Sequence, residues 1–342
     1  MSAAPYIPGF DGLRAVAAIV VIAFHLKIPG FSLGWSGVYL FFVLSGFLIT
    51  RILLNMKGHP RFFRTFYWRR SLRIFPIYYC ALAVAGLLAL QLNWPISDWP
   101  WYALYAQNWL LASNGFRSDF PELFNHTWTL AVEEQFYLLW PMIVFACSPP
   151  TLRMFLAWLI GACFVARFIN GGAWPILAFD ALAWGCLAAL IFPTPKSVPR
   201  SIAAASLAAS AAILILIVAR HGIERFWFPS GYIHDPFAGA LLLALLGPCF
   251  ASLLLLVFAS RDSLVLEAAP LRYAGRISYG LYLYHWPIIL LYDSMATPNF
   301  EWAPVRIVLI STLTLAVATL SYEFMERPIL RLRDSRRAYV GA

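Results

Sequence analysis

The chain has 342 residues, of which 61% are hydrophobic and only 12% are charged, about half the charged fraction of an ordinary soluble domain. Aromatic residues make up 17%, including 14 tryptophans. This composition excludes a disordered chain, a coiled coil and a collagen-like fibre. It also leaves too little polar side chain to cover a water-soluble globule, so we expect an integral membrane protein.

The formal net charge of +9 suits nucleic acid, anionic lipid or an anionic substrate as a partner. Most basic residues stand between apolar runs, which favours membrane topology, and we expect no nucleic-acid partner. The five cysteines lie in or beside apolar runs without a Cys-x-x-Cys pair, so we interpret them as buried small hydrophobic residues. We expect no metal site and no permanently bound cofactor.

Apolar runs of about 20 residues, long enough to cross a bilayer, recur along the whole chain. The predicted spans are residues 10–28, 33–54, 74–92, 127–146, 151–169, 174–192, 201–219, 237–259, 277–297 and 303–325. The stretch 99–112 is short and rich in Trp and Tyr, which is typical of the membrane interface, and the polar segment 220–236 predicts a loop. The predicted fold class is an all-α integral membrane protein with about ten transmembrane helices.

The basic residues set the orientation, because cytoplasmic loops carry the excess of Lys and Arg. The loop after the second predicted span and the tail after the last one are rich in arginine. With ten spans, both lie on the side of the N-terminus, so the N- and C-termini are predicted to be cytoplasmic. The sequence has no internal repeat and no linker, which predicts a single transmembrane domain over residues 1–342, with its core at residues 10–325.

Ionisable residues within spans are costly and usually carry function. Arg14 and His25 lie eleven residues apart on the first span, close to three helical turns, so both project from nearly one face. The helical rise separates them by about 16 Å along the axis, with Arg14 near the inner surface. Asp11 is expected to cap this helix. Alternatively, each residue simply reaches the nearest interface.

The fourth predicted span carries His126, Trp128, Glu133 and Glu134. His126 and Glu133 are seven residues apart and therefore share a helical face. A neutral imidazole held by a carboxylate makes a general base for a hydroxyl group, and the depth of the Glu pair is one that His25 of the first span can share. The alternative is a structural hydrogen-bond tie between helices.

The segment 62–76 is basic and aromatic and precedes the third span. Arg70 and Arg73, three apart on a helix, form a candidate phosphate site, because guanidinium forks bind phosphate oxygens well. Anchoring to anionic lipid, at about 1 kcal/mol per basic residue, is the alternative.

Near the C-terminus, Tyr284 and His285 are candidates to line a polar channel, or belong to an interfacial aromatic belt.

Several common catalytic motifs are absent, including the P-loop, Gly-x-Gly-x-x-Gly, His-Glu-x-x-His and Gly-x-Ser-x-Gly. Gly37, Ser45 and Gly46 are interpreted as small residues suited to close helix packing, not as a nucleophile elbow. Asp180 is a lone acid in the sixth predicted span and receives no assigned role.

Taken together, the motifs resemble the membrane acyltransferase-3 family of bacteria, over essentially the whole chain and in order. The matching motifs are Arg-x10-His in FDGLRAVAAIVVIAFH, GVYLFFVLSGFLIT, the Arg-x-x-Arg of Arg70 and Arg73, HTWTLAVEEQFYLLWP, ISYGLYLYHWP and YEFMERP.

This resemblance implies a membrane-bound O-acyltransferase of the bacterial inner (cytoplasmic) membrane. Such enzymes move an acyl group, most often acetyl, from an acyl-CoA donor such as acetyl-CoA to a hydroxyl of a cell-surface glycan or a lipid-linked sugar. The implied partners are therefore acyl-CoA, the glycan or lipid-linked saccharide, and membrane lipids. Some members carry an additional periplasmic esterase-like domain, and this chain is expected to stand alone without it.

On the same resemblance, Arg14, Arg70 and Arg73 are expected to hold the phosphates of coenzyme A. His25 is expected to take the proton of the attacking sugar hydroxyl, with Glu133 or Glu134 orienting the imidazole. An acyl-enzyme on His25 is the mechanistic alternative.

The substrate channel is expected to be lined by the remaining polar residues of the outer half, which are His126, Trp128, Tyr284 and His285. Tyr284 and His285 are candidates to stabilise the developing oxyanion. A transporter or flippase of a glycolipid or acyl carrier, without chemistry of its own, is the alternative function, since intramembrane Glu and His also suit a proton relay. A structural membrane scaffold is a third.

Overall fold

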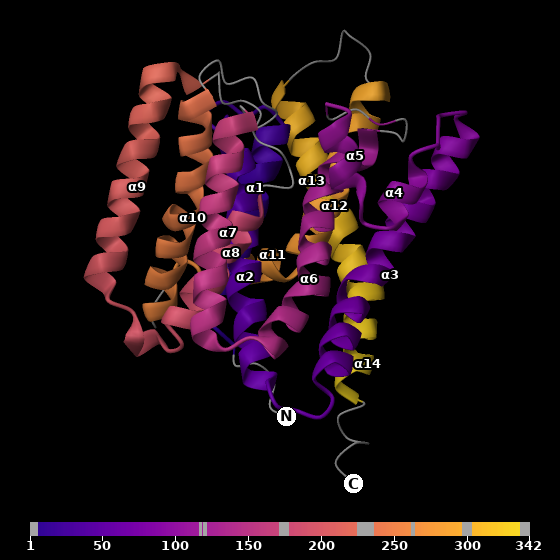
Figure 1. The fold of residues 1–342 in the computed structure, drawn as a ribbon. Helices are drawn as coiled ribbons and strands as arrows, with labels where there is room; N and C mark the ends of the chain where they lie inside the picture. Colours follow the sequence, from indigo (N-terminus) through magenta and orange to yellow (C-terminus); the bar gives the residue numbers. More distant parts are fainter. Residues whose placement is uncertain are drawn as a thin grey trace. The chain divides into compact units, whose positions relative to one another are not determined.

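The computed structural model is helical wherever it describes regular structure (Figure 1). The described residues are 6–115, 118, 122–170, 178–223, 236–260, 264–295 and 303–335. Within these ranges no residue is in a β-strand, so the predicted all-α class is confirmed. Most of the predicted loop 220–236, and the end of the C-terminal tail, lie outside the described residues.

Two compact units divide the chain, and each is assembled from two separated stretches of sequence. The first comprises residues 1–57 and 129–276, and the second comprises residues 58–128 and 277–342.

The first unit is built around close helix pairs: α2 against α8, α9 against α10, and α1 against α11. Glycines permit this closeness, because a Cβ on Gly46 of α2 would collide with the carbonyl of Leu182, and one on Gly185 of α8 would collide with that of Val43. The predicted packing role of Gly46 is therefore confirmed. The helices are α1 (Phe10–His25), α2 (Gly37–Met56), α6 (Trp128–Ala146, from Thr129 onward), α7 (Pro149–Asn170), α8 (Phe179–Ile191), α9 (Arg200–His221), α10 (Pro236–Ala259) and α11 (Ala269–Arg276).

The second unit packs α12 against α13 and places the long helix α3 against the C-terminal helical segments. A short π-helix interrupts the last helix of the chain, between α13 and α14. The elements are α3 (Phe62–Gln91), α4 (Trp99–Ala103), α5 (Gln107–Ser113), the 3-10 helix η2 (Glu122–Thr127), α12 (Ser278–Met295), α13 (Ala303–Ser321), the π-helix η6 (Tyr322–Glu326) and α14 (Arg327–Ser335).

Among the described residues, six helical segments are long and apolar enough to cross a membrane. They are Gly34–Met56, Phe62–Gln91, Pro149–Ile169, Arg200–His221, Phe237–Ala259 and Pro304–Arg331. A multi-pass helical membrane protein is therefore confirmed. Within the described residues each of the ten predicted spans overlaps a helix, while residues 174–177 and 296–297 of two spans lie outside that part. Helices α1, α6, α8 and α12 are shorter or carry polar residues that lower their hydropathy, so the number ten stays a prediction.

Two local features differ from the expected elements. Helix α3 has 30 residues and begins at Phe62, twelve residues before the predicted span. At 1.5 Å per residue it is about 45 Å long, which exceeds the roughly 30 Å thickness of a bilayer core. The additional length comes from its basic first turns, which precede its apolar part. Helix α11 was not predicted at all, because it is short and polar.

Asp180, which received no role from the sequence, forms a buried ion pair with Arg167. Its Oδ1 accepts a hydrogen bond from Nη2 of Arg167 at 2.7 Å, and Nη1 of Arg167 donates to Oδ2. The side chains are only 1% and 3% exposed, and Tyr39 of α2 lies beside them. The pair therefore ties α7 to α8 next to α2.

We expect Asp180→Ala to lower the free energy of unfolding by about 3–5 kcal/mol, because it leaves the Arg167 charge buried without its carboxylate. Unfolding of the purified protein by sodium dodecyl sulfate in mixed micelles measures this. The matched control is Asp293→Ala, which breaks an ion pair with Arg306 whose carboxylate is 42% exposed and should cost less than about 1 kcal/mol. Equal losses in the two variants would contradict the prediction.

Candidate active site

Arg14 and His25 lie on one uninterrupted helix, α1, which ends at His25. The helix is regular between them, so Arg14 and His25 project from nearly the same helix face, as expected. Both side chains are half-buried.

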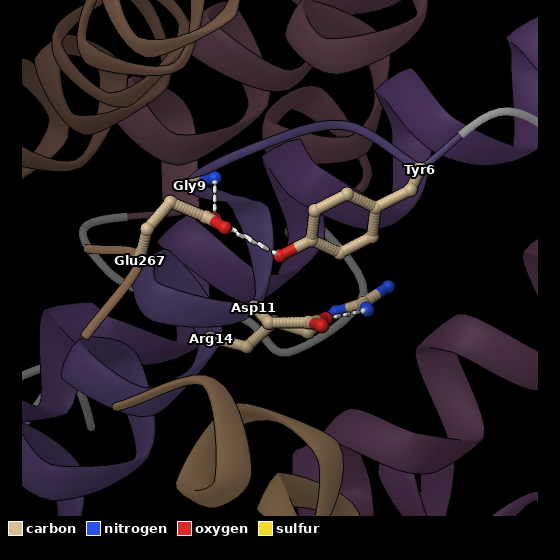
Figure 2. A network of polar contacts seen from close by, with 5 residues as sticks. All are labelled: Tyr6, Gly9, Asp11, Arg14 and Glu267. Carbon is tan, nitrogen blue, oxygen red and sulfur yellow. Dashed lines mark hydrogen bonds and ion pairs between the residues drawn. The ribbon is translucent and has the colours of Figure 1, made fainter. Parts of the chain in front are cut away.

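The expected cap by Asp11 is wrong: Asp11 lies inside the first turn and makes no capping bond. Its Oδ1 instead accepts a hydrogen bond from Nη1 of Arg14 at 3.3 Å (Figure 2), because a charged neighbour one turn away competes with the backbone amides.

Glu133 is held by a chain of hydrogen bonds between α6 and α2. The Tyr137 hydroxyl donates to Oγ of Ser45 at 3.1 Å, and the Ser45 hydroxyl donates to Oε1 of Glu133 at 2.6 Å. A hydroxyl bond to a carboxylate is charge-assisted and therefore stronger than a neutral one. The Glu133 carboxylate is thus fixed in direction while its side chain stays half-buried.

Sequence reasoning missed Ser45 as a polar partner, because it counted this residue only as a small one. The available signal was the spacing of Glu133 and Tyr137, which are four apart on one helix face and both need a polar neighbour in an apolar setting.

Further along the same two helices, other polar bonds hold α6 to α2. The indole Nε1 of Trp140 donates to Oγ1 of Thr50 at 2.9 Å, and Nζ of Lys57 donates to the carbonyl of Val144 at 2.7 Å. Glu134 is half-buried next to Glu133. The contact of His25 with either carboxylate stays a prediction.

In the second unit, the structure brings His126 of η2 together with His285 of α12. Their ring centroids are 5.3 Å apart, with planes nearly perpendicular. Nε2 of His126 donates to the carbonyl of Leu283 at 3.2 Å, and Nδ1 of His285 donates to the carbonyl of Tyr282 at 2.6 Å. Because carbonyls only accept, these bonds assign one nitrogen of each ring as protonated.

Tyr282, rather than the predicted Tyr284, is the tyrosine beside these histidines. Its hydroxyl donates to the carbonyl of His126 at 2.8 Å, and its ring contacts both imidazoles. Tyr282 and His285 are three apart and share a helix face, whereas Tyr284 is turned away. The hydroxyl of Tyr284 bonds to Oγ of Ser321 on α13 at 2.9 Å.

A buried polar network braces the segment that carries His126. The amide Nε2 of Gln107 donates to the carbonyl of Thr127 at 2.9 Å, and the Tyr102 hydroxyl donates to Oδ1 of Asn125 at 2.6 Å. Burial raises the pKa of Tyr102, so its hydroxyl stays protonated as a donor. The short helices α4 and α5 thus hold η2 in place up to Thr127, and the next residue, Trp128, is half-buried.

Arg70 and Arg73 lie one turn apart on α3 and are half-buried. Helix α3 packs against the π-helix η6, and the charge of Arg73 acts on the buried carboxylate of Glu326 in that segment. The Arg-x-x-Arg element therefore meets the C-terminal YEFMERP motif within one unit. π-Helical turns are frequent at functional sites.

The sequence-predicted site residues are distributed over both units. Arg14, His25, Glu133 and Glu134 belong to the first unit. The second unit holds Arg70, Arg73, His126, Trp128, Tyr284 and His285. Their union in one site stays a prediction.

Comparison with known proteins decides the family. A model of the acyltransferase-3 family, described as an acyltransferase domain, matches residues 7–323. The chain belongs to this acyltransferase family. The match covers the helices that carry all of the predicted site residues and confirms the resemblance seen in the motifs.

Curated relatives in the family are bacterial O-acetyltransferases. The chain is 31% identical to the peptidoglycan O-acetyltransferase OatA of Listeria monocytogenes, over 95% of this chain and 56% of that protein. It is 30% identical to the putative peptidoglycan O-acetyltransferase YrhL of Bacillus subtilis, over 95% and 55%, and 30% identical to the O-acetyltransferase OatA of Staphylococcus aureus, over 95% and 57%. The chain thus spans a little over half the length of these relatives. No solved structure was found to match it.

We expect Ser45→Ala to slow acyl transfer about tenfold to a hundredfold, because a hydrogen bond to a charged group contributes about 1.5–3 kcal/mol. Turnover by the purified protein measures this. Ser45→Thr keeps the hydroxyl and should retain most activity, and Ser294→Ala, at an exposed serine of α12 that bonds to the carbonyl of Leu291, is the matched control. Full turnover by Ser45→Ala would show that the bond to Glu133 plays no part in catalysis.

Proposed function

We propose that the chain transfers an acetyl group from acetyl-CoA to a hydroxyl of a cell-wall glycan, with peptidoglycan as the acceptor. The observation that carries this proposal is the family match over residues 7–323, together with relatives named peptidoglycan O-acetyltransferases over 95% of the chain. The proposed location is the bacterial inner membrane, with ten spans and both termini in the cytoplasm, as the basic residues favour.

On the donor side, Arg14, Arg70 and Arg73 bind the phosphates of coenzyme A. Guanidinium forks match phosphate oxygens, and all three side chains are half-buried rather than fully sequestered. Arg14 lies next to the carboxylate of Asp11, and the charge of Arg73 acts on the buried carboxylate of Glu326. The ion pair with Asp11 holds the Arg14 guanidinium in place before the anionic donor arrives.

In the chemical step, His25 acts as the general base. Its imidazole takes the proton of the sugar hydroxyl as the oxygen attacks the thioester carbonyl. The carbon–sulfur bond then breaks, the acetyl group stays on the sugar oxygen, and the coenzyme A thiolate leaves with the proton returned from His25. Glu133, fixed by Ser45, orients the imidazole and stabilises its charged form.

On the acceptor side, His126, Tyr282 and His285 form a compact polar cluster, which is 0–7% exposed and reaches sugar hydroxyl groups only when the residues that cover it move. Their rings lie within 5.3–5.5 Å of one another, centroid to centroid. Aromatic faces beside hydrogen-bonding groups suit a sugar, which has both apolar and hydroxyl surfaces. Trp128 at the start of α6 is assigned to the same acceptor path.

The proposal predicts that the chain, produced in a bacterial strain without its own peptidoglycan O-acetyltransferase, adds base-labile acetyl groups to the cell wall. Mass spectrometry of muropeptides measures the gain. His25→Ala should reduce it at least about a hundredfold, the contribution of a general base, whereas His59→Ala, at a histidine of the α2–α3 loop that accepts from the amide of Arg61, should not. An unmodified wall with the unaltered chain would refute the function, and full acetylation by His25→Ala would refute the general base.

The donor assignment predicts that the purified chain binds acetyl-CoA and that Arg73→Ala raises the dissociation constant about tenfold to a hundredfold, through loss of a charge-assisted contact. Isothermal titration calorimetry measures this. Arg64→Ala removes the same charge from an exposed position on the same helix and should change binding little. If the unaltered chain binds no acetyl-CoA, the donor assignment is wrong and transport without chemistry gains support.

A further inference from the structure

Helix α1 begins without a cap of its own. The residue before its first turn is Gly9, in the left-handed region with φ of 83°, and no side chain caps the helix from within. The first amides of a helix lack intrahelical acceptors, and Asp11, the acid closest in sequence, is engaged with Arg14. The carbonyl of Ile7 accepts the amide of Phe10 at 3.4 Å, and the amide of Gly9 just before the helix finds its acceptor elsewhere in the chain.

Glu267 supplies that acceptor from 258 residues away. Its Oε1 accepts the amide hydrogen of Gly9 at 2.5 Å, and the Tyr6 hydroxyl lies 2.9 and 3.0 Å from its two oxygens (Figure 2). Arg272 stands 3.9 Å from the same carboxylate. We call Tyr6, Gly9, Glu267 and Arg272 the Glu267 clamp. A carboxylate at this place also complements the positive end of the helix dipole.

The Tyr6 hydroxyl remains a donor to the clamp over the physiological pH range. Its partial burial raises its pKa, and the hydrogen bond and the charge of Glu267 raise it further. A neutral phenol beside a carboxylate donates a hydrogen bond to it, so Tyr6 helps to keep the Glu267 carboxylate in its place at the start of α1.

Glycines bring the backbone that carries Glu267 directly against α1. A Cβ on Gly12 would collide with the carbonyl of Leu266, and a Cβ on Gly275 of α11 would collide with that of Asp11. The height and rotation of the first turn of α1 are thus set by direct backbone contact on one side and by the Glu267 carboxylate at its end.

Arg14 lies one turn beyond this fixed start, and its side chain is 23% exposed beside Asp11. A helix is stiff over one turn, so any rotation of the first turn changes the direction of the Arg14 guanidinium. We propose that Glu267 is a positioning residue that orients Arg14 toward the phosphates of the acyl donor. This inference rests on the proposed function, in which Arg14 binds acyl-CoA.

The proposal predicts that Glu267→Ala raises both the dissociation constant and the KM for acetyl-CoA about fivefold to tenfold, the low end of the usual coupling between two places in one protein. The turnover number should change less than about twofold, because His25 lies at the far end of α1, fifteen residues from the first one. Full-length protein in detergent, with acetyl-CoA as the probe, gives both values. Glu267→Gln keeps an acceptor oxygen for Gly9 and should recover much of the affinity.

The matched control is Asp293→Ala, which also removes an acid paired with an arginine but lies in the second unit. If Glu267→Ala does not fold, Glu267→Gln tests the positioning role instead. Its expected loss of affinity for acetyl-CoA is smaller than that of Glu267→Ala but larger than that of Asp293→Ala. Unchanged KM in Glu267→Ala, or a loss confined to turnover or to the yield of folded protein, overturns the positioning role. Where Glu267→Ala does not fold, unchanged KM in Glu267→Gln overturns it.

A different result would refute the proposed function itself. The unaltered chain would then neither bind acetyl-CoA nor transfer acetyl groups, and the positioning role of Glu267 would be refuted together with the function. Tight binding by the unaltered chain and by Glu267→Ala alike would instead refute the clamp alone and leave the function standing.

Discussion

Contact between helix backbones at glycine is the constraint on which the first unit depends. Between helices in lipid there is little hydrophobic driving force, so association relies on close packing and polar bonds. Gly37 brings α2 against the carbonyl of Ala17 on α1, Gly46 brings it against α8, and Gly12 and Gly275 join α1 to α11. The helices that carry Arg14, His25 and Ser45 are therefore positioned by their backbones before any side chain contributes.

Between helices this close, polar side chains form two distinct kinds of contact, one fully buried and one still accessible. Arg167 and Asp180 are almost fully buried and pair in a fork, which leaves little access for a ligand and suits a structural tie. Glu133 is also held, through Ser45, but remains half-buried. A carboxylate fixed in direction and still accessible meets the need of a catalytic site, where groups are pre-organised and reach a substrate.

Hydropathy and spacing predicted the helices, their approximate ranges and the shared face of Arg14 and His25, because these depend on neighbours in sequence. The partners across helices were not predictable in the same way. Ser45 bonds to Glu133, 88 residues away in sequence, and Glu267 bonds to Gly9, 258 residues away. The sequence around these residues does not indicate either contact. Asp11 was misjudged for a different reason, because its competing partner Arg14 lies only three residues away. The hydroxyl of Tyr284 bonds to Ser321 over 37 residues, and the place of Tyr284 in the channel stays a prediction.

The division of the chain into two units has a consequence for synthesis. Residues 58–128 belong with residues 277–342, yet the whole second half of the first unit, residues 129–276, is made between them. Chains emerge at about 5–20 residues per second, so α3 to α5 wait about 7 to 30 seconds for α12 and α13. During that interval α3 lacks η6 and α14, against which it packs in the finished unit, and anionic lipid head groups can contact its Arg-rich start instead. The nascent protein therefore has a stage at which membrane composition can influence how readily its second unit is completed.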